Sequence, residues 1–71
     1  MLVSMTKWEV LSAFAKTIPN AERIEWEKNA PTFRVFFDGI HSQEFPCCKA
    51  EEYVRQNLRK RGFKNVHIEN D

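Results

Sequence analysis

The chain has 71 residues, of which 42% are hydrophobic and 30% are charged, and its formal net charge is +1. This length predicts one domain, residues 1–71, that buries only ~60% of the surface its unfolded form exposes. The near-neutral charge excludes strong long-range attraction toward nucleic acid, and no run approaches the ~18 apolar residues of a membrane span. With no export-type start and two adjacent cysteines, we expect a cytoplasmic protein without a membrane partner.

The first predicted element is a helix that begins with a capping box. Thr6 can accept from the backbone amide of Glu9, and the Glu9 side chain can reach back to the amide of Thr6. The following apolar residues recur at helical spacing: Leu11, Phe14, Ala15 and Ile18. Pro19 ends the helix, because the residue before a proline avoids helical geometry. Since the cap follows Met5 directly, we expect residues 1–4 to form a flexible N-terminal extension.

Three strands are predicted next, and the last two form a hairpin. Residues 22–28 alternate in polarity, residues 32–37 are rich in aromatic and β-branched side chains, and residues 40–45 would be the return strand. The Asp38-Gly39 dipeptide between them is typical of a tight turn. Two hairpin registers remain open.

The two registers differ in which residue faces Ile40. A two-residue turn places Phe37 opposite Ile40, and a three-residue loop places Phe36 there. A one-residue slip exchanges the two faces of a strand. In both registers at least one of Phe36, Ile40 and Phe45 falls on the face away from the core.

The second helix begins at Pro46 and ends before Gly62. Ala50, Val54 and Leu58 form its apolar stripe, and Gly62 followed by Phe63 predicts a Schellman motif. Residues 65–70 alternate again and predict a final strand. The sequence therefore predicts an α+β domain of order α-β-β-β-α-β, with an antiparallel sheet of three to four strands and both helices on one face. The pairing of the last strand, parallel or antiparallel, stays open.

Candidate catalytic and metal-binding residues are few. Cys47 and Cys48 lie at a predicted helix start, where the helix dipole favours a thiolate, but small buried cysteines are common. Together with His41 and His67 they offer zinc-ligand types without the usual spacing of paired cysteines. No phosphate loop or catalytic triad is recognisable. We therefore expect a chain that is not an enzyme, with no metal, no cofactor and no small-molecule substrate.

The basic C-terminal half of the second helix supports nucleic-acid binding as an alternative function. Its cations are Arg55, Arg59, Lys60, Arg61 and Lys64. Such side chains can contact phosphates, although cations at a helix C-terminus also complement the macrodipole. The α-β-β-β-α order resembles that of double-stranded-RNA-binding domains, whose last helix begins with several lysines. Here that start reads PCCKAEEY, with one lysine and two glutamates, so the chain is not assigned to that family.

The excess of aromatic residues favours protein binding as the main function. Phe36 and Phe45 are the predicted anchors, with Ile40 beside them and Arg34 and His41 at the rim. Exposed aromatic residues ringed by polar groups mark partner surfaces. We therefore expect a small non-enzymatic inhibitor, adaptor or regulator, of the kind that phages and mobile elements encode. Its partner is either another protein or a second copy of the chain.

Overall fold

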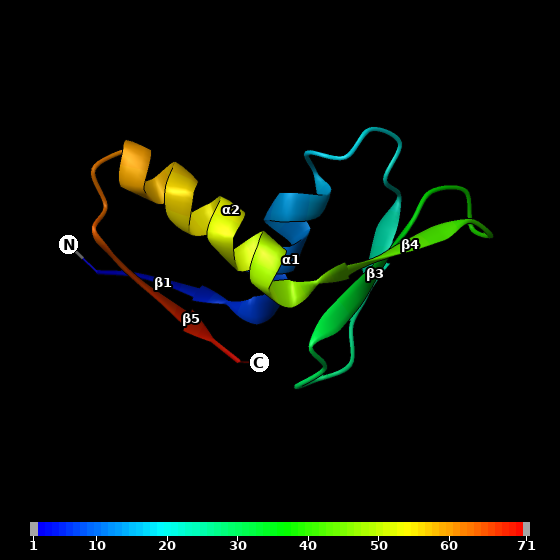
Figure 1. The fold of residues 1–71 in the computed structure, drawn as a ribbon, viewed down its shortest axis with the longest axis horizontal. Helices are drawn as coiled ribbons and strands as arrows, with labels where there is room; N and C mark the ends of the chain where they lie inside the picture. Colours follow the sequence, from blue (N-terminus) through cyan, green and yellow to red (C-terminus); the bar gives the residue numbers. More distant parts are fainter. Residues whose placement is uncertain (1, 71) are drawn as a thin grey trace.

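The computed structural model describes residues 2–70 and contains two helices and five strands (Figure 1). In chain order these are β1 (Leu2–Thr6), α1 (Lys7–Ala15), β2 (Arg23–Glu25), β3 (Thr32–Phe36), β4 (Ser42–Pro46), α2 (Cys47–Lys60) and β5 (Asn65–Glu69). β2, β3 and β4 form an antiparallel sheet, and β1 pairs with β5 in parallel. The predicted α+β class and element order are confirmed, with one additional strand at the start.

Local capping chemistry sets the ends of both helices. The capping box of α1 is confirmed, since the Thr6 hydroxyl accepts from the Glu9 amide at 3.2 Å and Glu9 Oε1 accepts from the Thr6 amide at 2.9 Å. After α2, the amide of Phe63 donates to the Leu58 carbonyl and that of Gly62 to the Arg59 carbonyl, both at 3.0 Å. Gly62 has a φ of 97°, which completes the predicted Schellman motif.

The N-terminal residues do not form the predicted flexible extension. Leu2–Thr6 form β1, in which Val3 lies opposite Val66 and Met5 opposite Ile68 of β5. Residues 2–4 therefore belong to the fold, while residue 1 lies outside the described residues. The final strand pairs with β1 and not with the three-stranded sheet, which settles its direction as parallel.

The hairpin between β3 and β4 adopts neither of the two predicted registers. Phe36 lies opposite Ser42 and Phe33 opposite Phe45, and the Phe37 amide donates to the His41 carbonyl at 2.9 Å. The loop is therefore Asp38–Ile40, three residues long but one residue further along than the predicted three-residue loop. Asp38 explains this register, because its carboxylate accepts hydrogen bonds from the backbone amides of Ile40 at 3.1 Å and His41 at 2.6 Å.

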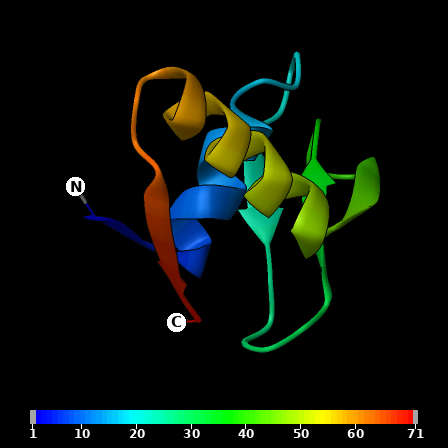
Figure 2. The ribbon, with the colours of Figure 1, turned by 60° about the vertical axis from the view of Figure 1, so that its left-hand side comes forward.

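The core lies where both helices meet the inner face of the three-stranded sheet. Its fully buried side chains include Val10 and Leu11 of α1, Val35 of β3 and Ala50 of α2. The turned view in Figure 2 places the β1–β5 pair on one side of the helices and the three-stranded sheet on the other. The predicted packing of both helices on one sheet face is confirmed.

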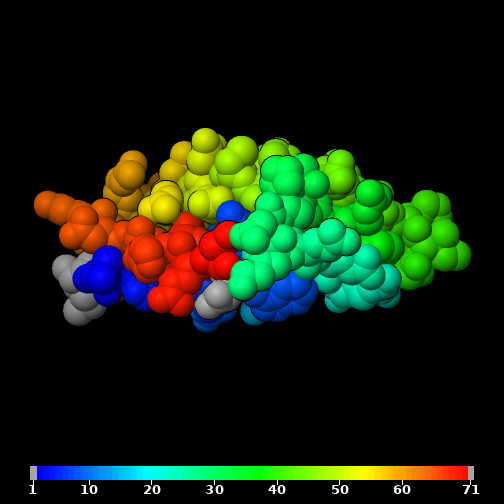
Figure 3. All heavy atoms as spheres, turned by 90° about the horizontal axis from the view of Figure 1, so that it is seen from below, coloured from blue at the N-terminus to red at the C-terminus, as the bar shows by residue number. Residues whose placement is uncertain are grey.

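The molecule is elongated for its size. Its extents are 41 × 25 × 14 Å and its radius of gyration is 12.4 Å, whereas a compact chain of this length has about 11 Å. The hairpin loop lies at one end of the long axis and the turn after α2 at the other (Figures 1 and 3). An elongated chain keeps much of its surface accessible to partners.

Candidate functional site

The five residues predicted to bind a partner do not gather in one patch. Phe45 faces inward from β4 and is half-buried, with its ring centroid 5.5 Å from that of Phe14 and 5.9 Å from that of Phe33. Lys49 lies over the outer part of the Phe45 ring, with Nζ 5.9 Å from its centroid. Phe45 therefore packs against the core from the inner face of the sheet, on the face opposite to Phe36.

Phe36 lies on the opposite, outer face of the sheet. The Arg23 guanidinium covers its ring, with the central carbon 3.9 Å from the ring centroid. Arg34 lies on the same face and donates to the Ser42 hydroxyl at 3.1 Å, with Glu44 3.7 Å away. Because polar and charged groups surround this single ring, the outer face is not an apolar patch.

Ile40 lies in the hairpin loop and His41 directly follows it, whereas Phe36 and Phe45 lie in the paired strands. Ile40 is 84% exposed, and His41 Nδ1 lies 2.5 Å from Asp38 Oδ2. Hydrogen bonds from the His41 amide, the His41 ring and the Ile40 amide lower the pKa of Asp38 to about 2. Asp38 thus holds the loop in shape, and the Ile40 side chain is left exposed to solvent.

The predicted basic residues divide into one structural cation and four exposed ones. Arg55 is half-buried, and its Nη1 donates to the Val66 carbonyl at 2.8 Å, so it connects α2 to β5. Arg59, Lys60, Arg61 and Lys64 are exposed at the end of α2. None of these four forms an ion pair within residues 2–70.

The two cysteines lie at the start of α2 in different environments. Cys47 is buried, its Sγ donates to the Ala30 carbonyl at 3.4 Å, and burial raises the pKa of its thiol. A raised pKa opposes the thiolate that a nucleophile or a metal ligand needs. Cys48 is exposed and also free. In the described part of the chain, no three His, Cys, Asp or Glu side chains lie close enough together to hold a metal ion.

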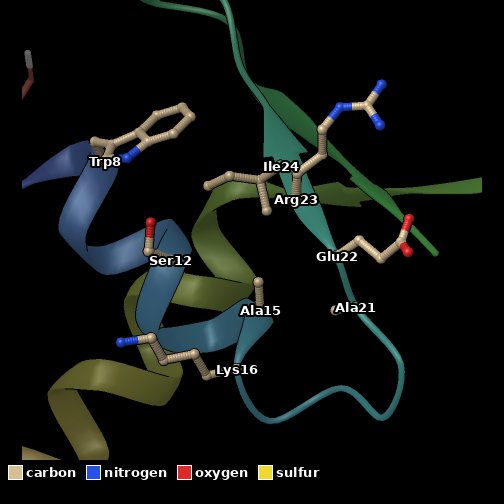
Figure 4. Close-up of a pocket in the computed structure, with 8 residues that line it drawn as sticks. All are labelled: Trp8, Ser12, Ala15, Lys16, Ala21, Glu22, Arg23 and Ile24. Carbon is tan, nitrogen blue, oxygen red and sulfur yellow. The ribbon is translucent and has the colours of Figure 1, made fainter. Parts of the chain in front are cut away.

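A groove between α1 and β2 brings together residues that the sequence did not single out as a site. It has a volume of about 280 Å³ and is lined by Trp8, Ser12, Ala15 and Lys16 on one side and by residues 21–24 on the other. Trp8 and Ile24 extend into the space between the two elements (Figure 4). We call this feature the α1–β2 groove.

Helical spacing explains why the groove is hollow. Trp8, Ser12 and Ala15 lie four and three residues apart, so they share one side of α1. Trp8 is 45% exposed, whereas tryptophans are highly buried on average. The small side chains of Ser12 and Ala15 leave space beside that ring. A bulky residue followed by small ones on one helix side was the available sequence signal.

The groove runs along an unpaired sheet edge. β3 occupies one side of β2, and no strand within residues 2–70 pairs with its other side. An edge strand presents backbone N–H and C=O groups that an added strand can pair with. The arrangement therefore combines an apolar hollow with backbone hydrogen-bonding groups, which are the two components of strand-addition sites.

Comparison with known proteins adds no family assignment. The sequence matches no protein-family model, and neither a curated protein nor a solved structure is significantly similar to the chain. Among residues 2–70, no helix is long and apolar enough to cross a membrane.

Proposed function

We propose that the chain is a small binding module that acts by protein–protein contact through the α1–β2 groove and the free edge of β2. The observation that carries this proposal is the position of Trp8, which is 45% exposed beside a hollow lined with apolar atoms. Exposed tryptophans in such positions are typical anchors of protein interfaces. In this proposal Trp8 and Ile24 replace Phe36 and Phe45 as anchors.

The size of the groove favours polypeptide over small-molecule binding. Its volume of about 280 Å³ lies just below the ~300–1,000 Å³ of ordinary small-molecule sites. An extended segment needs less depth, because it gains backbone hydrogen bonds along the strand and inserts only alternate side chains. This mode of contact suits an inhibitor or an adaptor, because the bound segment is held in place and no reaction is catalysed on it.

Selection from a displayed library of random peptides tests this proposal. We expect enriched peptides whose binding changes the fluorescence of Trp8 and is lost in Trp8→Ala. Ile40→Ala is the matched control, because Ile40 is more exposed than Trp8 but lies at the hairpin loop outside the groove. Peptides that bind the Trp8→Ala variant as well as the original chain would contradict the proposal.

Nucleic-acid binding is a second candidate, supported by the four exposed cations at the end of α2. Arg59, Lys60, Arg61 and Lys64 are free of ion pairs within the described residues and are accessible to phosphates. We expect Arg59→Ala/Lys60→Ala/Arg61→Ala to abolish a mobility shift with RNA or DNA at low salt. Lys28→Ala, a cation in a distant turn, is the control. Absence of any shift with the unchanged chain would refute this candidate.

A further inference from the structure

We infer that the partner of the α1–β2 groove is a second copy of this chain, joined by antiparallel pairing of the two β2 strands. This inference rests on the proposed function, because it names the occupant of the same surface. The product is a twofold dimer whose two three-stranded sheets join along β2. In such a symmetric interface both copies contribute the same residues.

The charges of β2 are complementary to themselves when the strand is reversed. β2 reads Arg23-Ile24-Glu25. With the twofold axis at Ile24, Arg23 of each copy lies directly opposite Glu25 of the other. Directly opposite residues of antiparallel strands lie on the same face, so two ion pairs form on the outer face. This complementarity is the reason for choosing a second copy over an unrelated segment.

The same charges disfavour the neighbouring registers. A slip by one residue places inward-facing Ile24 against an outward-facing charge, which exchanges the faces. The next registers that preserve the faces place Arg23 opposite Arg23 or Glu25 opposite Glu25 of the other copy. Like charges directly opposite each other destabilise a strand pair. Among these registers, only the one centred on Ile24 therefore keeps Ile24 on the inner face and places opposite charges across from each other.

Apolar contacts favour this register on the inner face. Ile24 is half-buried in the single chain, and in the dimer it meets Ile24 of the other copy. The exposed part of Trp8 lies in the groove beside Ile24, where the added strand covers it. Because the strand has only three residues, the dimer is held by few backbone bonds, and we expect it to dissociate on dilution.

Charged residues on a short edge strand can also prevent that strand from pairing with another chain. In β2 the two charged side chains are close enough to interact with each other within one chain. Arg23 Nη2 lies 3.4 Å from Glu25 Oε2 of the same chain, with both side chains about half exposed. Pairing between copies exchanges the two internal contacts, one in each chain, for two contacts across the axis. The two interpretations differ in their predictions for variants with reversed charge.

Analytical ultracentrifugation of charge-reversal variants tests the inference. The unchanged chain should approach twice its 8.4 kDa mass as its concentration rises toward the millimolar range. Arg23→Glu and Glu25→Arg should each weaken dimerisation at least tenfold, because each sets like charges opposite one another. The double variant should restore the dimer, and so should an equimolar mixture of the two single variants. Circular dichroism of each variant checks that the fold is retained.

The possible outcomes separate the inference from the proposed function. A chain that stays monomeric at every concentration overturns the inference, as does a dimer that both single variants leave unchanged. If such a chain still binds selected peptides through Trp8, the proposed function stands and only the identity of the partner is wrong. If it is monomeric and selects no peptide, the proposed function fails as well.

Discussion

Truncation of Phe45 should destabilise the protein more than truncation of Phe36, because the two rings lie on opposite faces of the same sheet. Phe45 packs against Phe14 and Phe33, and each aromatic pair contributes about 0.5–1.5 kcal/mol beyond the burial of area. Adding the partial burial of the ring, Phe45→Ala should cost about 3 kcal/mol. Phe36 loses its contact with Arg23, worth about 0.5–1 kcal/mol, and some packing, for a total of about 1 kcal/mol.

Urea unfolding at low micromolar concentration, followed by circular dichroism, measures both costs. A chain of this length has a free energy of unfolding of about 4–11 kcal/mol, so both variants should remain folded in water at all but the lowest of these values. With an m-value of about 1 kcal/mol/M, the two midpoints should differ by about 2 M urea. Equal midpoints, or a lower midpoint for Phe36→Ala, would refute the assignment of Phe45 to the core and of Phe36 to the outer face.

Three further predictions concern the thiols, the first strand and the hairpin loop. In the folded chain a thiol reagent should modify Cys48 quickly and Cys47 only on unfolding, because burial protects the Cys47 thiol and raises its pKa. Rapid modification of both thiols in the folded chain would contradict this. Deletion of residues 1–4 should lower the free energy of unfolding by about 1–2 kcal/mol through lost pairing with β5, and an unchanged melting temperature would show that β1 is dispensable. The folded pKa of Asp38 is lowered from 3.8 to about 2, so its contribution to stability is present above about pH 4 and is lost as the pH falls through 2. Thermal melts of Asp38→Ala should therefore lie below those of the unchanged chain at pH 7 and converge with them only below pH 2. A difference that stays constant with pH would argue against this role.

Features determined by neighbouring residues could be predicted from the sequence. The capping box involves residues three positions apart, and the Schellman motif after α2 depends on one glycine and the residue after it. The alternation of residues 65–70 likewise predicted the final strand, whose apolar residues Val66 and Ile68 are half-buried.

Features that depend on distant segments could not be predicted in the same way. β1 pairs with β5 across more than sixty residues, and the stretch Leu2–Thr6 carries no turn that would reveal its partner. The hairpin register was missed because it depends on the Asp38 carboxylate and not on the apolar pattern of the strands. The α1–β2 groove depends on the placement of a helix beside a sheet edge, which single-residue patterns do not encode.

An isotope-filtered nuclear Overhauser experiment on a mixture of labelled and unlabelled chains tests the central claim most directly. The account predicts intermolecular contacts from the Ile24 methyl groups to Ile24 and Trp8 of the other copy, growing with concentration. The contrary result would be a concentrated sample without such contacts, or with contacts confined to Ile40 at the hairpin loop or to the basic end of α2.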